Sequence, residues 1–373
     1  MNDDIASCAS NAGDSNSNEP NSNHSHFGHS TPGERRHVAI VGGGVIGSGW
    51  AARFVLNGID VAVFDPDPDT PRIAGEILAN AERAFERLFG ADRPPRGDLR
   101  FGENLADTVT SAFFVQESVP ERLDLKRRIL ADIDAAAPPE TIIASSTSGL
   151  LPSEMQRDLA HPQRLLVGHP FNPVYLLPLV ELVAGRDTSP QSIEGAHRLY
   201  ASIGMKPVRV AKEIDAFIGD RLQEALWREA LWLVRDGIAT VEEIDDVIRY
   251  SFGLRWAQMG VFQTYRIAGG EAGMRHFLEQ FGPALAWPWS RLVDVPDLDE
   301  TLIETIAEQS DDQAHGRSIR ELERIRDNNL IAIMQGLEGG SPEGGAEDGW
   351  GAGAALGEFR KAMKAKAQGG KTP

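Results

Sequence analysis

A glycine-rich turn between two short apolar runs constrains this chain more than any other feature. The apolar run Val38 to Val41 leads into glycines at G-x-G-x-x-G spacing, Gly42, Gly44 and Gly47, and a second apolar run ends at Asp65. In such a turn the first glycine allows a tight bend, the second lets the backbone approach a pyrophosphate, and the third lets the following helix pack on the strand. The helix N-terminus then offers free N–H groups to the phosphates. The combination of strand, turn, helix and terminal acid predicts a dinucleotide-binding unit.

The expected coenzyme is NAD rather than NADP. Asp65 stands close to the position where a carboxylate would accept a hydrogen bond from the ribose 2′-hydroxyl, and its charge would repel a 2′-phosphate. The predicted coenzyme-binding residues of the turn and the acid are Gly42, Gly43, Gly44, Val45, Ile46, Gly47 and Asp65.

Charge and composition exclude several classes of function. The formal net charge of −18 argues against binding to nucleic acid or to an anionic membrane surface, since both attract basic patches. No apolar run approaches the length of a membrane span, and the N-terminus lacks the basic and apolar regions of a signal peptide. Cys8 is the only cysteine, so no internal disulfide is possible, in keeping with a reducing compartment. A cytoplasmic protein without nucleic-acid or membrane partners is therefore expected.

The hydrophobic pattern changes once along the chain. Up to about residue 210, short apolar runs alternate with helical stretches, which predicts an α/β fold with a mostly parallel, Rossmann-type sheet. From Asp215 onward the pattern is helical, with Leu222, Leu226 and Leu233 on one face. We therefore expect an NAD-binding domain over 35–211 and an all-helical C-terminal domain over 212–335.

Both ends of the chain are expected to lie outside these domains. Residues 1–34 are rich in small polar residues and carry too little apolar surface to offset the entropy of ordering, which predicts a disordered tail. His24, His26 and His29 could form a metal clip there, but a solvated tail is the favoured interpretation and no metal site is predicted. Residues 336–373 alternate glycine-rich and Lys/Ala-rich stretches and are interpreted as a low-complexity C-terminal tail.

One region beyond the glycine turn places ionisable residues among apolar ones. His169 follows an apolar run directly, and Glu181 stands inside the run LVELV. An ionised carboxylate in an apolar strand is costly to bury unless a partner pairs with it, and an imidazole on the neighbouring strand would serve. Such a pair makes a general base, because the acid fixes the ring tautomer and stabilises its protonated form. A structural histidine at a strand end and an edge-strand Glu181 facing water explain the same residues equally well.

Two further strand ends carry polar candidates. Ser148 comes just after the strand TIIASS, on the side where ligands bind in an open sheet, and its hydroxyl could bond a substrate oxygen. Turn formation or capping of a helix that begins near Pro152 is the simpler explanation. Glu117, after the strand AFFV, is assigned to the coenzyme site as a contact on the nicotinamide side, although a simple strand-end acid fits equally.

Together these motifs resemble the 3-hydroxyacyl-CoA dehydrogenase family. In that family an NAD fingerprint is followed by an S-x-T-S turn, an H-x-F-N-P segment, a V-E strand and a helical second domain. The corresponding segments here are Ser145–Ser148, His169–Pro173 and Val180–Glu181. The resemblance runs from about residue 36 to residue 335, and the combination is more specific than any single motif.

The resemblance implies a role for each matching residue. His169 is the expected catalytic base, Glu181 its orienting acid, and Ser148 the hydroxyl that holds the substrate oxygen. Asn172 falls within the same signature and is expected to support the turn at the substrate site. A homodimer formed through the helical domain is also implied.

One position departs from the family pattern. Where the family has F-[IV]-x-N-R at the start of the second domain, this chain has FIGDR, so Asp220 replaces an Asn that helps to hold the reacting end of an acyl-CoA. An ionised carboxylate only accepts hydrogen bonds and carries charge, whereas an amide both donates and accepts. Asp220 therefore suits a cationic substrate better than a neutral thioester, provided that the two come near each other.

The helical domain is also rich in aromatic residues. Aromatic faces bind quaternary ammonium groups through their negative quadrupoles. Phe252, Trp256 and Tyr265 lie in an irregular stretch with glycines and are assigned to substrate binding. Filling of a helical core is the alternative, and it is the favoured interpretation for Trp227 and Trp232.

These substitutions match a carnitine-oxidising branch of the family. The blocks SVPERLDLK, SSTSGLLPS and NPVYLLPLVELV resemble that branch most closely. The resemblance implies oxidation of the 3-hydroxyl of L-carnitine, a small acid with a trimethylammonium group, to 3-dehydrocarnitine with NAD. Two alternatives stay open: a 3-hydroxyacyl-CoA dehydrogenase that acts on a short-chain thioester, and a catalytically silent NAD-binding structural or regulatory protein.

Overall fold

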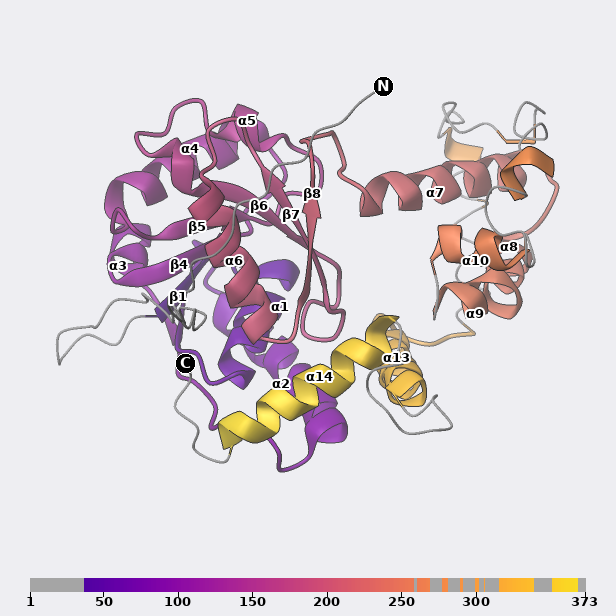
Figure 1. The fold of residues 1–373 in the computed structure, drawn as a ribbon, viewed down its shortest axis with the longest axis horizontal. Helices are drawn as coiled ribbons and strands as arrows, with labels where there is room; N and C mark the ends of the chain where they lie inside the picture. The colour runs from indigo at the N-terminus through magenta and orange to yellow at the C-terminus, as the bar shows by residue number, and fades with distance from the viewer. Residues whose placement is uncertain are drawn as a thin grey trace, which may run out of the picture.

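An eight-stranded sheet with helices on both faces forms the larger part of the molecule (Figure 1). The computed structural model describes residues 37–257, 260–268, 277–280, 289–290, 299–301, 305, 315–338 and 351–367. The strands are β1 (His37–Val41), β2 (Val61–Phe64), β3 (Leu99–Phe101), β4 (Ala112–Glu117), β5 (Ile142–Ser145), β6 (Leu165–Pro170), β7 (Leu179–Ala184) and β8 (Lys206–Val210). The predicted N-terminal tail, with its three histidines, lies outside the described residues.

The sheet is mostly parallel, as predicted. The strand order is β3-β2-β1-β4-β5-β6-β7-β8, and neighbouring strands run parallel except for β6 and β7, which pair antiparallel. The order reverses between β1 and β4, and in open sheets ligands bind outside the carboxyl ends of the strands at such a switch point. The edge strand β3 was not predicted, because its three residues, LRF, are too few to form an apolar run.

Helices cover both faces of the sheet. On one face lie α1 (Val45–Leu56), α2 (Thr70–Phe89) and α6 (Pro190–Ser202), and on the other lie α3 (Leu105–Val109), α4 (Leu123–Ala136) and α5 (Pro152–Met155). Alternate residues of β1 enter the two cores, with Val38 and Ile40 in the first and Ala39 and Val41 in the second. Burial on both faces explains why these strands appear in the sequence as continuous apolar runs.

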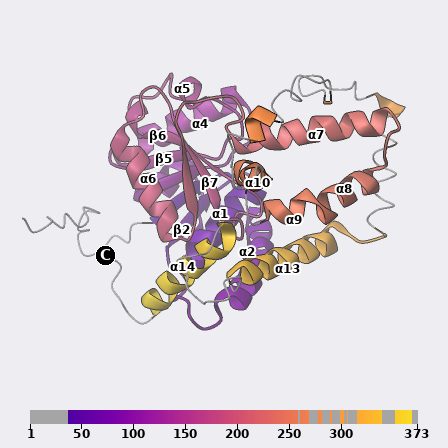
Figure 2. The same cartoon turned by 45° about the vertical axis from the view of Figure 1, so that its right-hand side comes forward.

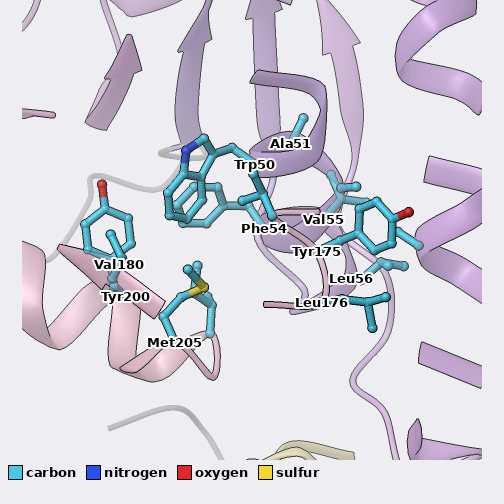
Figure 3. Close-up of a cluster of buried hydrophobic side chains, with 14 of the residues drawn as sticks. Trp50, Ala51, Phe54, Val55, Leu56, Tyr175, Leu176, Val180, Tyr200 and Met205 are labelled. Carbon is cyan, nitrogen blue, oxygen red and sulfur yellow. The ribbon is translucent and has the colours of Figure 1, made fainter. Parts of the chain in front are cut away.

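Large aromatic side chains fill the core beneath α1 (Figure 3). Trp50 and Phe54 of α1 are fully buried together with Tyr200 of α6, and the ring centroids of Trp50 and Tyr200 lie 5.0 Å apart. The Tyr200 hydroxyl donates a hydrogen bond to the side chain of Gln116 on β4. This bond satisfies a polar group that would otherwise be costly to bury, and it joins α6 to the middle of the sheet.

A buried arginine ties α1 to segments that are distant in the sequence. The guanidinium of Arg53 donates hydrogen bonds to the backbone carbonyls of Val174, Ile203 and Gly204, at 2.9, 3.1 and 2.8 Å. Desolvation lowers the pKa of Arg53 to about 9. The carbonyl oxygens replace water as hydrogen-bond partners, so this cation anchors the loop after β6 and the end of α6 onto α1.

Beyond β8 the chain continues as helices. In Figure 1, α7 (Gly219–Arg235) runs outward from the sheet, and α8 (Val241–Tyr250), α9 (Phe252–Trp256) and α10 (Val261–Ala268) gather beside it. Trp227 of α7 is 53% exposed, so the core-filling interpretation of this residue is wrong for the single chain. Within the described ranges, no helix is both long and apolar enough to span a bilayer.

Two C-terminal helices pack against the sheet domain. α13 (Ile319–Glu338) and α14 (Gly351–Ala367) contact each other, and Figures 1 and 2 show both beside α2. Phe359 of α14 meets Phe85 and Phe89 of α2 edge-on, with ring centroids 6.3 and 5.1 Å apart. The Lys366 ammonium group donates a hydrogen bond to the carbonyl of Ser202 at the end of α6.

The interpretation of residues 336–373 as a low-complexity tail is wrong for residues 351–367. Leu356, Phe359 and Met363 of α14 are buried. Their spacing places all three on one face of the helix, and this apolar face is enough to pack an otherwise polar helix against the sheet domain. The abundant Gly, Ala and Lys around them concealed this stripe in the sequence.

The docking of α14 predicts the effect of one substitution. Phe359→Ala removes a buried ring and is expected to lower the free energy of unfolding by about 3–5 kcal/mol, because the cavity between α14 and α2 closes only in part. Urea unfolding followed by circular dichroism measures this difference. Glu358→Ala, at an exposed position of the same helix, is the control and should change stability little. Equal effects of the two substitutions would contradict the docking.

Candidate active site

The glycine turn after β1 leaves no room for side chains where the backbone packs on itself. Gly42 has a φ of +100°, and a Cβ there would lie 2.5 Å from the carbonyl carbon of Ser118, just beyond β4. A Cβ on Gly47 would lie 1.8 Å from the carbonyl oxygen of Gly42. Glycine is therefore required at both positions, at Gly42 for the turn and at Gly47 for close packing of helix on strand.

The outer side of the same turn is open. A Cβ built on Gly44 meets nothing within 4 Å. Val45 and Ile46 begin α1, which has no side-chain cap and no acidic residue in its first turn, so its first N–H groups lack intrahelical acceptors. Asp65 accepts a hydrogen bond of 2.6 Å from the backbone N–H of Gly43, which holds its carboxylate beside the turn. These residues fit a dinucleotide, with N–H groups for the pyrophosphate and a carboxylate for a ribose hydroxyl.

His169 and Glu181 face each other across the antiparallel strands β6 and β7. They are register partners, and Nδ1 of His169 lies 2.9 Å from Oε2 of Glu181. The other carboxylate oxygen accepts hydrogen bonds of 3.0 Å from the backbone N–H groups of Ile218 and Gly219, at the start of α7. Both side chains are buried, so the alternative of a Glu181 that faces water is wrong. Burial raises the pKa of Glu181, but the hydrogen bonds from His169 and from α7 together hold that pKa below its ordinary value.

The second ring nitrogen of His169 also faces a carboxylate. Nε2 lies 3.7 Å from Oδ2 of Asp220 on α7, which is too far for a hydrogen bond. Burial raises the pKa of Asp220, and the charge of His169 opposes this rise. The carboxylates of Glu181, Glu224 and Glu121 raise the pKa of Asp220 further. The structure thus brings Asp220 to the histidine, a placement that the sequence left open.

One carboxylate holds the turn that carries Ser148. Glu121 accepts hydrogen bonds from the hydroxyl of Thr147 and from the backbone N–H groups of the next two residues, at 3.1 and 3.2 Å. The Ser148 side chain is exposed, and α5 begins without a side-chain cap, so capping does not explain this serine. Asn172, in the loop after β6, is exposed as well. Glu121 was not identified from the sequence. The available signal was its position as a second acid, in the polar loop that follows AFFVQE.

Glu117 forms a buried ion pair at the end of β4. Its Oε1 lies 2.8 Å from the ammonium nitrogen of Lys126 and accepts a hydrogen bond of 2.7 Å from the N–H of Val119. Its Oε2 accepts a hydrogen bond from the hydroxyl of Ser145. Because both oxygens already have donors and the side chain is fully buried, the geometry favours a strand-end acid over a direct contact with the coenzyme. Lys126 was missed, because nothing in the sequence shows that a helical lysine folds back onto the strand end.

The predicted aromatic residues lie in the helical part of the chain. Phe252 and Trp256 pack against each other at the two ends of α9, with ring centroids 4.6 Å apart. Tyr265 of α10 stacks on Phe277 at 4.8 Å. Among the ring contacts of the described residues, none joins these side chains to β6 or β7, so their assignment to substrate binding stays a prediction.

Two family models match the chain. The model of the 3-hydroxyacyl-CoA dehydrogenase NAD binding domain matches residues 37–214, and that of the 3-hydroxyacyl-CoA dehydrogenase C-terminal domain matches residues 217–306. The first match spans the whole sheet, and the second begins two residues before α7.

Similar proteins share the greater part of the sequence. A protein named L-carnitine dehydrogenase from Mesorhizobium japonicum is 60% identical over 326 residues, which are 87% of this chain and 88% of that protein. One from Rhizobium meliloti, named L-carnitine dehydrogenase/betainyl-CoA thioesterase, is 62% identical over 87% of this chain, but this chain spans only 65% of its length. A solved structure of an NAD+-dependent 5-formyl-3-hydroxy-2-methylpyridine 4-carboxylic acid 5-dehydrogenase has a TM-score of 0.69 and 29% identity, over 82% of this chain and 99% of that chain.

The lowered pKa of Glu181 predicts a pH-dependent contribution to stability. A carboxyl group whose pKa is lower in the folded state stabilises the fold above its unfolded pKa, about 4.3 for Glu, and loses this effect as the pH falls through the folded value. Glu181→Gln is therefore expected to lower the free energy of unfolding by about 1–3 kcal/mol at neutral pH, and by less and less below pH ~4. Urea unfolding of both proteins over a range of pH measures this difference.

The exposed Glu103 provides the control for that measurement. Glu103→Gln is expected to leave stability nearly unchanged over the same pH range. A loss of stability in Glu181→Gln that stays constant down to acidic pH would contradict an ionised, hydrogen-bonded carboxylate at this position.

Proposed function

The chain belongs to the 3-hydroxyacyl-CoA dehydrogenase family, in the branch of the L-carnitine dehydrogenases, and we propose that it oxidises the 3-hydroxyl of L-carnitine to 3-dehydrocarnitine in carnitine catabolism. Membership makes it an NAD-dependent dehydrogenase that acts on a secondary alcohol. The names of the relatives support the substrate. Within the site, the proposal rests on one observation, the carboxylate of Asp220 beside Nε2 of His169.

His169 acts as the general base in this proposal. The Glu181 carboxylate accepts a hydrogen bond from the protonated Nδ1, and in this tautomer Nε2, on the side that faces Asp220, carries no proton. Nε2 removes the proton of the C3 hydroxyl, and the buried carboxylate stabilises the imidazolium that results. The hydroxyl of Ser148 holds the substrate oxygen while the carbonyl forms.

NAD supplies the hydride acceptor for this reaction when it is bound. The residues that hold it in our proposal are the turn Gly42 to Gly47 and Asp65. The open space at Gly44 and the uncapped start of α1 suit the pyrophosphate. The carboxylate of Asp65 selects a ribose with a free 2′-hydroxyl.

The acidic surroundings of His169 suit a cationic substrate. In carnitine only two carbon atoms separate the hydroxyl oxygen from the ammonium nitrogen, so a base that reaches the hydroxyl also has the cation close by. Asp220 lies 3.7 Å from Nε2, and Glu121 and Glu224 add further negative charge. A quaternary ammonium group keeps its charge at every pH and therefore gains from partly buried carboxylates, whereas a neutral thioester does not.

We further propose a cytoplasmic homodimer. Leu222 and Trp227 of α7 are 63% and 53% exposed, and Leu254 of α9 is exposed as well. Exposed apolar surface of this kind is typical of an interface, and most interfaces of this kind join identical chains. Cys8 as the single cysteine supports a reducing compartment.

A comparison of substrates tests the proposed reaction. The protein is incubated with NAD and either L-carnitine or 3-hydroxybutyryl-CoA, and NADH is followed by absorbance. We expect kcat/KM for L-carnitine to exceed that for the thioester by at least ~100-fold, because the acidic site is left without a cation when the thioester binds. D-carnitine and other 3-hydroxy acids define the selectivity further. Turnover of the thioester alone would contradict the proposal.

Substitution of His169 distinguishes an enzyme from a catalytically silent NAD-binding protein. His169→Ala is expected to lower kcat by about 10²–10⁴-fold while the Kd for NAD stays the same. His197→Ala, at a partly exposed position of α6, is the matched control. If the wild-type protein oxidises none of these alcohols and His169→Ala changes nothing, the silent protein is the correct alternative.

The proposed dimer predicts a change of mass on substitution. In sedimentation velocity the wild-type protein is expected at the mass of two chains. Leu226→Glu combined with Trp227→Glu buries charge at the interface and should give single chains. Arg228→Glu reverses a charge on another side of α7 and should leave two chains together. Single chains in the wild-type protein would contradict the dimer.

A further inference from the structure

His169 is enclosed on several sides by groups that do not exchange a proton with water. Its side chain is only 5% exposed, and the rings of Phe171 and Phe217 lie 5.0 and 5.5 Å from the imidazole, centroid to centroid. Glu181, beside Nδ1, is 2% exposed, and its second oxygen is occupied by the N–H groups of α7. A proton that Nε2 takes from the substrate must nevertheless leave before the next turnover.

Asp220 faces both Nε2 and solvent. Among the described residues it is the second acid within 4 Å of the His169 ring, and its side chain is 28% exposed. The distance of 3.7 Å leaves the lone pair of Nε2 free for a substrate hydroxyl, because no hydrogen bond forms at that length. After Nε2 gains a proton, the attraction between imidazolium and carboxylate favours a shorter distance. The contact is therefore weak before the reaction and strong after it.

We propose that Asp220 carries the substrate proton from His169 to solvent, an inference that rests on the proposed function. The O–H bond of the alcohol breaks as an Nε2–H bond forms, its electron pair becomes the second bond of the carbonyl, and the pair of the C3–H bond leaves as hydride to NAD. Nε2–H then gives its proton to Oδ2 of Asp220, and the carboxylic acid releases it to water. His169 returns to its neutral form, and the products are the ketone, NADH and one proton.

The groups that face Asp220 favour this transfer. They are His169 on β6, Glu181 on β7, Glu224 on the same helix and Glu121 in the loop after β4. Burial and the three carboxylates raise the pKa of Asp220, against the opposing charge of His169. A raised pKa makes the carboxylate a stronger base and therefore a better acceptor for the proton of Nε2. The partial exposure of Asp220 then allows the proton to pass on.

Asp220→Asn tests the relay, because an amide keeps the shape of the side chain but does not accept a proton at neutral pH. In a single turnover in weak buffer, NADH is followed by absorbance and the released proton by an indicator dye. In the wild-type enzyme the proton appears together with NADH. In Asp220→Asn the proton is expected to lag behind NADH, with steady-state kcat lowered by about ten-fold or more. Added imidazole, at constant pH and ionic strength, should restore kcat in the variant and leave the wild type unchanged.

Two further variants keep the test specific. Glu224→Gln removes an equal charge from the same helix and should show no lag, whatever its effect on KM. Asp220→Glu keeps a carboxylate and should shorten the lag, and NAD binding measured by fluorescence confirms that each variant is folded. Simultaneous appearance of NADH and proton in Asp220→Asn, without dependence on imidazole, overturns the relay. So does a raised KM for L-carnitine as the sole change, which would limit Asp220 to binding the cation.

The proton relay and the proposed substrate can be contradicted independently of each other. If the wild-type enzyme does not oxidise L-carnitine, the proposed substrate is wrong. The lag is then measured with the 3-hydroxyacyl thioester that the enzyme does oxidise, and its presence or absence decides the relay in the same way.

Discussion

The buried carboxylate of Glu181 is the contact on which the rest of the site depends. One oxygen pairs with the imidazole of His169, and the other accepts the first free N–H groups of α7. Loss of either set of donors would leave an unpaired charge among apolar strands, which costs several kcal/mol, about 3–5 in measured cases. The carboxylate therefore fixes strand, histidine and helix in one arrangement. Asp220 lies near Nε2 only because α7 begins at this point.

The topology of the sheet brings this contact and the coenzyme turn to the same edge. β1, β4, β5 and β6 run parallel, so the glycine turn, Glu117, the turn with Ser148 and His169 all lie at or just beyond the carboxyl ends of these strands. The close approach of Gly42 to Ser118 joins the first two of these segments. β7 runs the other way, and this reversal allows Glu181, in the middle of its strand, to stand opposite a histidine near the end of β6.

The parts of the site that the sequence predicted are those that depend on local pattern. The spacing of the glycines defines a turn by itself. A carboxylate inside an apolar run made a His169–Glu181 contact one of two equal interpretations, because burial of an unpaired charge is costly, and the family resemblance then favoured the contact. The ion pair of Glu117 and Lys126 and the carbonyl partners of Arg53 could not be predicted, because they join segments whose neighbourhood only the fold decides. The docking of residues 351–367 could not be predicted for the same reason, because a single apolar stripe indicates a packed helix only when the surface that it contacts is known.

The close packing of the start of α7 against the end of β6 fixes the distances between His169 and the acidic residues around it. A Cβ on Gly219 would lie 2.2 Å from the ring of Phe171, so a larger residue would displace either that ring or the first turn of α7. A displaced helix would lengthen both hydrogen bonds from α7 to Glu181 and move Asp220 away from Nε2, although no ionisable residue had been changed. Leu222, three residues further along, belongs to the exposed apolar surface of the same helix. A single helix thus provides the N–H groups that bind Glu181, the carboxylate beside His169 and the surface proposed for dimerisation. The geometry around His169 is therefore coupled to whatever packs on that surface.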